Sequence, residues 1–317
     1  MEREVLVTAG NGMFGHALIT ALLGDERVKV RAMVRDRDKF KLKAPNLEVV
    51  VADMDAPETL APAVAGVTHV FLTAPMDAHI AAREIAVMKA VQVAGGAHIL
   101  KLFGAVKHEG DALKAEHGAS LDYLKASGLP RTLISPSSVM ETSLLAYAEL
   151  LKFDCVMGMS GEGKVGLVAA EDVALATRAV VLSDGHEGQN YELTGPAALS
   201  LYGVCNVFSQ VLGRRIHYYD MPEDEFAAMM LEHGDMTAEE LEIGVLCHLR
   251  AWRDGKADLV TDTYTKLTGE PPTSLDDWIG DHIDSFEAKP GFGDRIAGFF
   301  MHQKYARHHD DGEAHKE

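Results

Sequence analysis

Residues 4–15 read EVLVTAGNGMFG, and this stretch decides the fold. Its first five residues form a short apolar run, which is typical of a buried parallel strand. A G-x-G-x-x-G turn follows, made of Gly10, Asn11, Gly12, Met13, Phe14 and Gly15. Apolar residues then recur at helical spacing from Phe14 to Leu23. A glycine turn of this pattern between a strand and a helix indicates a dinucleotide-binding site.

Each glycine of the turn has a physical role in that pattern. The first permits a tight turn, the second leaves room for a pyrophosphate, and the third lets the helix pack closely on the strand. The pyrophosphate then meets free N–H groups at the positive end of the helix dipole. The alternative is a turn that merely connects strand and helix. It is disfavoured because two further cofactor signals follow at the expected distances.

The residues after the second strand, expected over 29–34, favour NADP(H) over NAD(H). Sites for NAD usually place an acidic residue there to bind the ribose 2′-hydroxyl. This chain has Arg35 instead, whose guanidinium suits a 2′-phosphate. Arg37 and Lys39 add positive charge, unless they only form a solvated loop. NAD(H) stays possible, since Asp36 would serve a ribose hydroxyl if the loop register differed by one residue.

The third and fourth strands, expected over 47–51 and 67–73, end in further candidate cofactor contacts. Asp53 follows the third strand, where a carboxylate either accepts a hydrogen bond from the adenine amino group or caps a turn. The fourth strand ends in Thr73, Ala74 and Pro75. In open α/β sheets, ligands bind at the carboxyl ends of the strands where the strand order reverses. We therefore expect these residues to line the cofactor.

Strands alternate with helices up to about residue 136, which predicts an α/β fold with a doubly wound parallel sheet. Further strands are expected over residues 97–102, 131–134, 164–168 and 189–193. Helices are expected over residues 58–65, 78–94, 117–127, 170–182, 199–212 and 237–254. We predict a Rossmann domain over residues 1–152, to which the chain returns around 164–195. A smaller α/β substrate lobe is predicted over 196–288 together with 153–163, and a flexible tail over 289–317.

The amino-acid composition argues against several classes of binding partner and indicates the cellular location. The formal net charge of −18 argues against direct binding to nucleic acid or to an anionic membrane, because both require a clustered positive surface. Cys155, Cys205 and Cys247 lie far apart in apolar surroundings, which indicates reduced, buried thiols and a cytoplasmic location. The chain has neither an evident signal segment nor an apolar run long enough to span a bilayer. No metal-binding motif is evident, and a monomer or homodimer is expected.

With these residues in hand, the sequence resembles the NmrA-like family of atypical short-chain dehydrogenases/reductases. The resemblance rests on the glycine turn, Val34-Arg35, Ala52-Asp53-Met54 and later landmarks such as Glu192-Leu193-Thr194-Gly195-Pro196. It implies that Met54 lies with the cofactor-binding residues. Some members of that family reduce quinones, dyes, azo compounds or enones with a pyridine nucleotide. Others bind the nucleotide without known turnover and report redox state to a partner.

The chemistry of this chain departs from that of conventional short-chain dehydrogenases. None of its tyrosines has a lysine four residues later, so the usual proton donor for an isolated carbonyl is missing. Candidate catalytic residues are Lys107, His108 and His117, although an exposed loop and a structural histidine are the alternatives. The turn at Ser135 and Pro136 is expected to pass the nicotinamide. Phe103 is expected to pack on the nicotinamide or in the substrate pocket, together with Met76, Val139 and Met140, unless these residues are plain core.

Two functions follow from these observations. The first is an NADPH-dependent oxidoreductase that reduces a small, conjugated, apolar acceptor by direct hydride transfer. Such an acceptor needs little acid catalysis because the developing anion is delocalised. The second is a catalytically silent NADP(H)-sensing regulator or interaction protein, which the missing Tyr-x-x-x-Lys pattern favours.

Overall fold

The computed structural model describes residues 3–108, 110–234 and 236–287, and the chain divides into two compact units. Unit 1 comprises Met1–Pro136, Ala170–Leu193 and Thr261–Pro271. Unit 2 comprises Ser137–Ala169, Thr194–Val260 and Pro272–Glu317. The tail predicted over residues 289–317 lies outside the described residues.

Unit 1 is built on a seven-stranded parallel sheet with the order β3-β2-β1-β4-β5-β6-β9. Its strands are β1 (Arg3–Val7), β2 (Val28–Val34), β3 (Leu47–Val51), β4 (His69–Leu72), β5 (His98–Leu102), β6 (Arg131–Pro136) and β9 (Asn190–Leu193). The order reverses between β1 and β4, and Val5 of β1 faces Val30 on one side and His69 on the other. The carboxyl ends of β1 and β4 therefore form the crevice in which open α/β sheets bind ligands.

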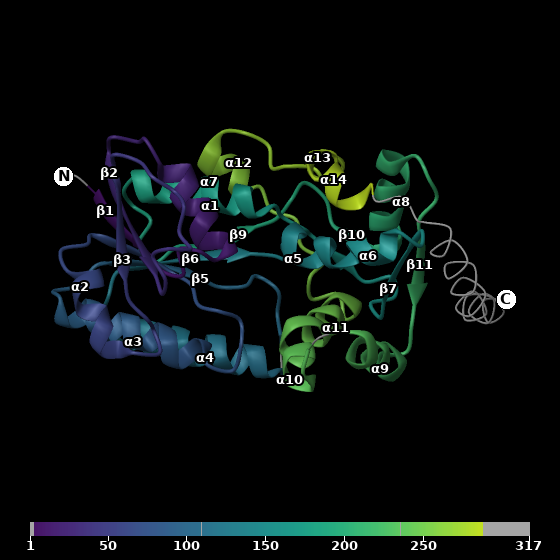
Figure 1. Ribbon diagram of the computed structural model, residues 1–317, viewed down its shortest axis with the longest axis horizontal. Helices are drawn as coiled ribbons and strands as arrows, with labels where there is room; N and C mark the ends of the chain where they lie inside the picture. Colours follow the sequence, from purple (N-terminus) through teal and green to yellow (C-terminus); the bar gives the residue numbers. More distant parts are fainter. Residues whose placement is uncertain (1–2, 109, 235, 288–317) are drawn as a thin grey trace. The chain divides into compact units, whose positions relative to one another are not determined.

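Helices cover both faces of this sheet, as predicted. They are α1 (Met13–Leu22), η1 (Pro57–Thr59), α2 (Leu60–Val64), α3 (Ile80–Val93), α4 (Ala112–Ala126), α7 (Ala170–Leu182) and α12 (Thr263–Thr268). Figure 1 shows α3 and α4 on one face and α1, α7 and α12 on the other. On the first face the strand residues Leu6, Val70 and Ile99 pack with Val87 and Leu124 in one buried apolar cluster. The predicted doubly wound Rossmann sheet is confirmed.

Unit 2 contains two strand pairs surrounded by helices. β7 (Cys155–Gly158) pairs in parallel with β11 (His217–Asp220), and β8 (Lys164–Val165) pairs antiparallel with β10 (Leu199–Ser200). Its helices are α5 (Met140–Leu144), η2 (Leu145–Tyr147), α6 (Ala148–Leu151), α8 (Leu201–Leu212), α9 (Glu223–His233), α10 (Ala238–Leu241), the π-helical η3 (Glu242–Leu246), α11 (Cys247–Arg253), α13 (Leu275–Asp281) and α14 (Ile283–Phe286). In the described part of both units, no helix combines the length and the apolar character that crossing a membrane requires.

Three predicted elements differ from those observed by more than small shifts at their ends. The strand expected over 164–168 shortens to β8, because the N–H of Gly166 donates to the Ala257 carbonyl at 3.2 Å and that of Val168 to the Ser138 carbonyl at 3.0 Å, so neither pairs with β10. The helix expected over 237–254 is interrupted by the π-helical segment η3. The helix expected from His117 begins instead at Ala112, because Leu113 provides a buried anchor one turn earlier. His117 therefore lies inside α4 rather than at its start.

Candidate active site

The glycine turn joins β1 to α1 through a fixed set of backbone hydrogen bonds. The N–H of Gly10 donates to the Met33 carbonyl at 2.8 Å, and the N–H of Gly12 donates to the Ala9 carbonyl at 2.7 Å. Gly12 is the N-cap of α1 and, having no side chain, leaves the helix end uncovered. The N–H groups of the first turn, at residues 13–15, have no intrahelical acceptors and point out of the helix end. This end of α1 is therefore ready to bind an anion.

Gly15 allows α1 to pack directly on the end of β1. A Cβ atom at this position would lie 2.4 Å from the Ala9 carbonyl oxygen and 2.9 Å from that of Thr8. Ala9 itself adopts a left-handed backbone conformation, with φ of 48°. The turn is thus too tight for any side chain at Gly15, which fits the role predicted for the third glycine.

Thr8 connects the ends of β1 and β4. Its Oγ1 donates to the Thr73 carbonyl at 2.7 Å and accepts from the Thr73 N–H at 2.9 Å. This pair of hydrogen bonds fixes the start of the segment Thr73-Ala74-Pro75 beside the glycine turn. Sequence reasoning missed Thr8, although a hydroxyl residue at the end of an otherwise apolar strand is a visible signal.

Three basic residues of the loop after β2, Arg35, Arg37 and Lys39, were predicted to bind the 2′-phosphate, and the structure gives them different surroundings. Arg37 donates to the Val49 carbonyl, and Lys39 Nζ lies 3.6 Å from the Asp36 carboxylate. Asp36 also accepts the N–H of Asp38 at 3.0 Å, so its carboxylate already serves the loop. Arg35 is exposed, and its guanidinium forms no hydrogen bond or ion pair within the described residues. Of the three predicted basic residues, Arg35 is the one whose guanidinium is available to a ligand.

The segment after β3 uses part of the Asp53 carboxylate for itself. Asp53 Oδ1 accepts the N–H of Asp55 at 3.0 Å, which is the turn-capping role left open by the sequence. The side chain of Met54 is buried in the apolar cluster of unit 1. Met54 therefore supports the site from within the core, and its side chain is not exposed to a ligand.

Arg83 links the loops that follow β3 and β4, and it was not predicted. From α3, its Nε donates to Asp55 at 2.8 Å and its guanidinium donates to Asp77 at 2.6 Å. The hydrogen bond from Arg83 lowers the pKa of Asp55, and it also lowers that of Asp77 against the opposing effect of burial. The two loops that flank the cofactor crevice are thus held by one partly buried guanidinium.

The chain continues its pairing with β6 beyond the end of β5. The N–H of Phe103 donates to the Ile134 carbonyl and that of Ala105 to the Pro136 carbonyl, both at 2.8 Å. The Phe103 ring contacts the His117 ring edge-to-face, with centroids 5.7 Å apart. Phe103 and His117, predicted separately, are therefore brought together at the carboxyl end of β5.

The other predicted residues at this end have different surroundings. Lys107 is exposed, whereas His108 is buried with Nδ1 3.8 Å from the Asp111 carboxylate. Ser135 is buried and donates to the Asn190 side-chain carbonyl at 2.6 Å, so its hydroxyl serves the sheet rather than a ligand. Met76 in the loop after β4 is 49 % exposed.

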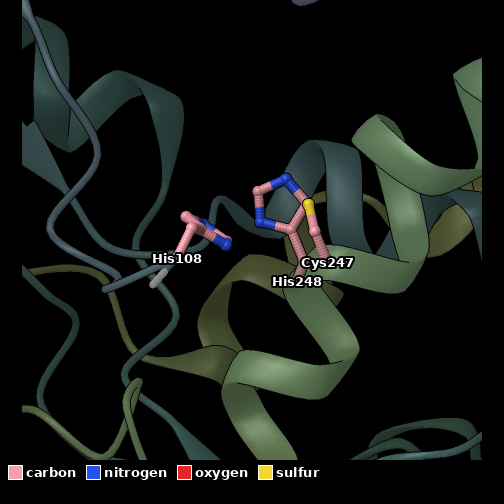
Figure 2. A group of neighbouring side chains, drawn as sticks. All are labelled: His108, Cys247 and His248. Atoms are coloured by element: carbon pink, nitrogen blue, oxygen red, sulfur yellow. The ribbon is translucent and has the colours of Figure 1, made fainter. Parts of the chain in front are cut away.

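Val139 and Met140 lie in unit 2 and are buried. Met140 lines a cavity of about 160 Å³ within this unit, whose other walls include Val165, Leu167, Leu199 and Leu275. Unit 2 also carries Cys247 and His248, consecutive residues at the start of α11, whereas His108 belongs to unit 1 (Figure 2). The Cys247 thiol donates to the Ile243 carbonyl at 3.1 Å, so it takes part in the helix hydrogen bonding.

Known proteins that are similar in sequence bind or use NAD(P)H. A family model described as NAD(P)H-binding matches residues 9–182. The chain is 29 % identical to an NAD(P)H azoreductase from Xenophilus azovorans, over 90 % of this chain and 99 % of that protein. It is 27 % identical to quinone oxidoreductase 2 from Escherichia coli, over 86 % of this chain and 96 % of that protein.

Solved structures show the same fold. An NADPH-dependent quinone oxidoreductase from Escherichia coli, in complex with NADPH, superposes with a TM-score of 0.80 at 25 % identity, over 88 % of this chain and 99 % of that chain. A triphenylmethane reductase from Citrobacter sp. in complex with NADP(H) superposes with a TM-score of 0.77 at 23 % identity, over 88 % of this chain and 99 % of that chain.

Proposed function

The chain belongs to the NAD(P)H-binding family, and on that premise we propose that it is an NADPH-dependent reductase of a conjugated, apolar acceptor such as a quinone, azo compound or enone. The observation that carries the proposal is the available guanidinium of Arg35 beside a glycine turn whose helix end is open. A phosphorylated ribose is the group that such a guanidinium binds best at this position.

The residues present fit NADPH. The N–H groups of residues 13–15 would bind the pyrophosphate, Arg35 would bind the 2′-phosphate, and the segment from Thr73 to Pro75 would line the crevice. The steric demand at Gly15 supports this placement, because a Cβ there would push α1 away from the position that presents its N–H groups. When bound, NADPH supplies a hydride to the acceptor.

The acceptor class follows from what the chain lacks and from its relatives. Reduction of an isolated carbonyl needs a proton donor, and no tyrosine here has the partner lysine that lowers its pKa. A conjugated acceptor spreads the developing negative charge, so positioning supplies most of the catalysis. The azoreductase and quinone oxidoreductase among the relatives act on acceptors of this kind by name. Phe103 and the exposed Met76 supply apolar contact area on unit 1.

A steady-state panel tests the proposal. The loss of NADPH absorbance is followed with quinones, azo dyes and enones, and with simple aliphatic aldehydes and ketones as the contrasting set. We expect turnover with at least one conjugated acceptor and little with the aliphatic set. NADPH binding without oxidation by any acceptor would overturn the proposal and favour the sensing function, which the missing Tyr-x-x-x-Lys pattern also accommodates.

A further inference from the structure

A fully buried charged cluster lies beneath the carboxyl end of β5. Lys101 of β5, Glu84 of α3 and Ser120 of α4 are 0 %, 1 % and 0 % exposed. Lys101 Nζ donates to Glu84 Oε2, and Ser120 Oγ donates to the same oxygen at 2.5 Å. Well-packed apolar residues are often as stabilising as a buried ion pair, because both charges lose their hydration. Stability alone therefore does not account for the cluster.

The cluster is connected to the site through aromatic contacts. Lys101 Nζ lies 6.0 Å from the centroid of the Phe103 ring, and Phe103 contacts His117 edge-to-face. In this fold the adenosine half of the nucleotide lies over β2, where Arg35 stands, and the nicotinamide half lies across the switch point, over β4 and β5. Phe103 and His117 are thus on the side of the sheet where hydride transfer takes place.

His117 is a neutral imidazole at physiological pH. Burial, followed by the positive charges of Lys101 and His108, lowers the pKa of His117 to about 3. Nδ1 is buried and has no hydrogen-bond partner within the described residues. Nε2 makes no hydrogen bond there either, but it is not among the buried atoms. A proton on Nδ1 would be enclosed without an acceptor, so the tautomer with the proton on Nε2 is favoured.

We infer that His117 presents its Nε2–H as a neutral hydrogen-bond donor to the carbonyl oxygen or azo nitrogen of the acceptor, and that Lys101, Glu84 and Ser120 are positioning residues that hold Phe103 and His117 in place. This inference rests on the proposed reductase function. The hydride from the cofactor and a proton from water account for the two hydrogens and two electrons that the acceptor gains. His117 stabilises the developing anion and neither gains nor loses a proton.

Two substitutions of His117 separate its role as a hydrogen-bond donor from the packing of its ring on Phe103. His117→Phe keeps an aromatic ring beside Phe103 but removes the donor, whereas His117→Gln keeps an N–H close to the position of Nε2. We expect His117→Phe to lower kcat about 10- to 100-fold with little change in KM, and His117→Gln to retain most of the activity. The dissociation constant for NADPH, measured by calorimetry, should change less than about twofold, since a factor of two is under 0.5 kcal/mol. The imidazole NMR signals of His117 should not titrate near pH 6.5.

Three results would overturn the inference. An equally active His117→Phe protein, beside an active wild type, would overturn it while leaving the proposed function intact. Titration of His117 near pH 6.5 would do the same, independently of any activity. A wild-type protein that binds NADPH and reduces no acceptor would overturn both proposals.

The positioning role is tested by non-additivity. Glu84→Met/Lys101→Met replaces both charges together, so that neither is left buried alone, and Ser120→Ala is a milder second variant. Each should bind NADPH with wild-type affinity and lower kcat. In the His117→Phe background each should cause no further loss, because the cluster acts through His117. Losses that multiply in the combined variants would show that the cluster acts independently of His117.

Discussion

Gly15→Ala perturbs the phosphate turn at a point where the structure leaves no room. The new Cβ would lie 2.4 Å from the Ala9 carbonyl oxygen and 2.9 Å from that of Thr8. Ordinary van der Waals contact begins near 3.4 Å, so the start of α1 must move about 1 Å away from the end of β1. Both obstacles are backbone atoms, which cannot rotate away as a flexible side chain can.

This shift has two measurable effects. Overpacking of this kind costs about 1–3 kcal/mol in the free energy of unfolding. It also draws the first N–H groups of α1 away from the pyrophosphate. A lost hydrogen bond to a charged group is worth about 1.5–3 kcal/mol, which is at least about tenfold in Kd. The pyrophosphate is common to NADPH and NADH, so affinity for both should fall together.

Calorimetric titration with each nucleotide measures these affinities, and urea denaturation measures the stability. Gly280→Ala in α13 is the matched control, because its added Cβ has no atom within 4 Å among the described residues outside its own stretch of helix. The control should bind as the wild type does and should be no less stable, since alanine is the better helix former. A Gly15→Ala protein with wild-type affinity for both nucleotides would refute the assignment of this turn to the pyrophosphate.

Three further predictions concern unit 1. Thr8→Val removes the hydroxyl that bonds Thr73 and should cost about 1–3 kcal/mol of unfolding free energy in urea denaturation, whereas Thr8→Ser should cost less. Arg83→Ala frees the loops after β3 and β4 and should lower the melting temperature and weaken NADPH binding; unchanged affinity would show that the loops hold their positions without it. Burial, with the charges of His98 and Arg3, lowers the pKa of His69 to about 4, so the unfolding free energy should fall as pH drops from 6.5 towards 4, because the unfolded chain binds the proton more readily. Urea denaturation of His69→Gln should show a shallower pH dependence.

Local signals predicted the cofactor end of the sheet. The glycine turn and the arginine after β2 are each set by a few consecutive residues, and the parallel sheet follows from the alternation of strands and helices. The sequence already placed Arg35 where an acidic residue usually stands, whereas the partners of Arg37 and Lys39, Val49 and Asp36, depend on how the loop folds back and came from the structure.

Contacts between distant residues escaped prediction. Lys101 interrupts an apolar strand, and nothing near it in sequence identifies Glu84 and Ser120 on two different helices as its partners. The Arg83 link joins two loops through a helix for the same reason. The hydrogen bond from the Ser135 hydroxyl to Asn190 was not predicted either, because Asn190 lies on a strand that the chain adds much later. In unit 2 the short apolar run of β7 lacks a periodicity that separates strand from helix.

The central claim, that Arg35 selects the phosphorylated ribose, is tested most directly by titrating Arg35→Ala with NADPH and NADH in the calorimeter. The binding free energy of NADPH should become less favourable by about 1–3 kcal/mol. That of NADH should change little, because only NADPH carries the 2′-phosphate. Lys39→Ala, whose ammonium pairs with Asp36, should leave the ratio of the two affinities unchanged. Equal losses for both nucleotides in Arg35→Ala, or none for either, would contradict the account.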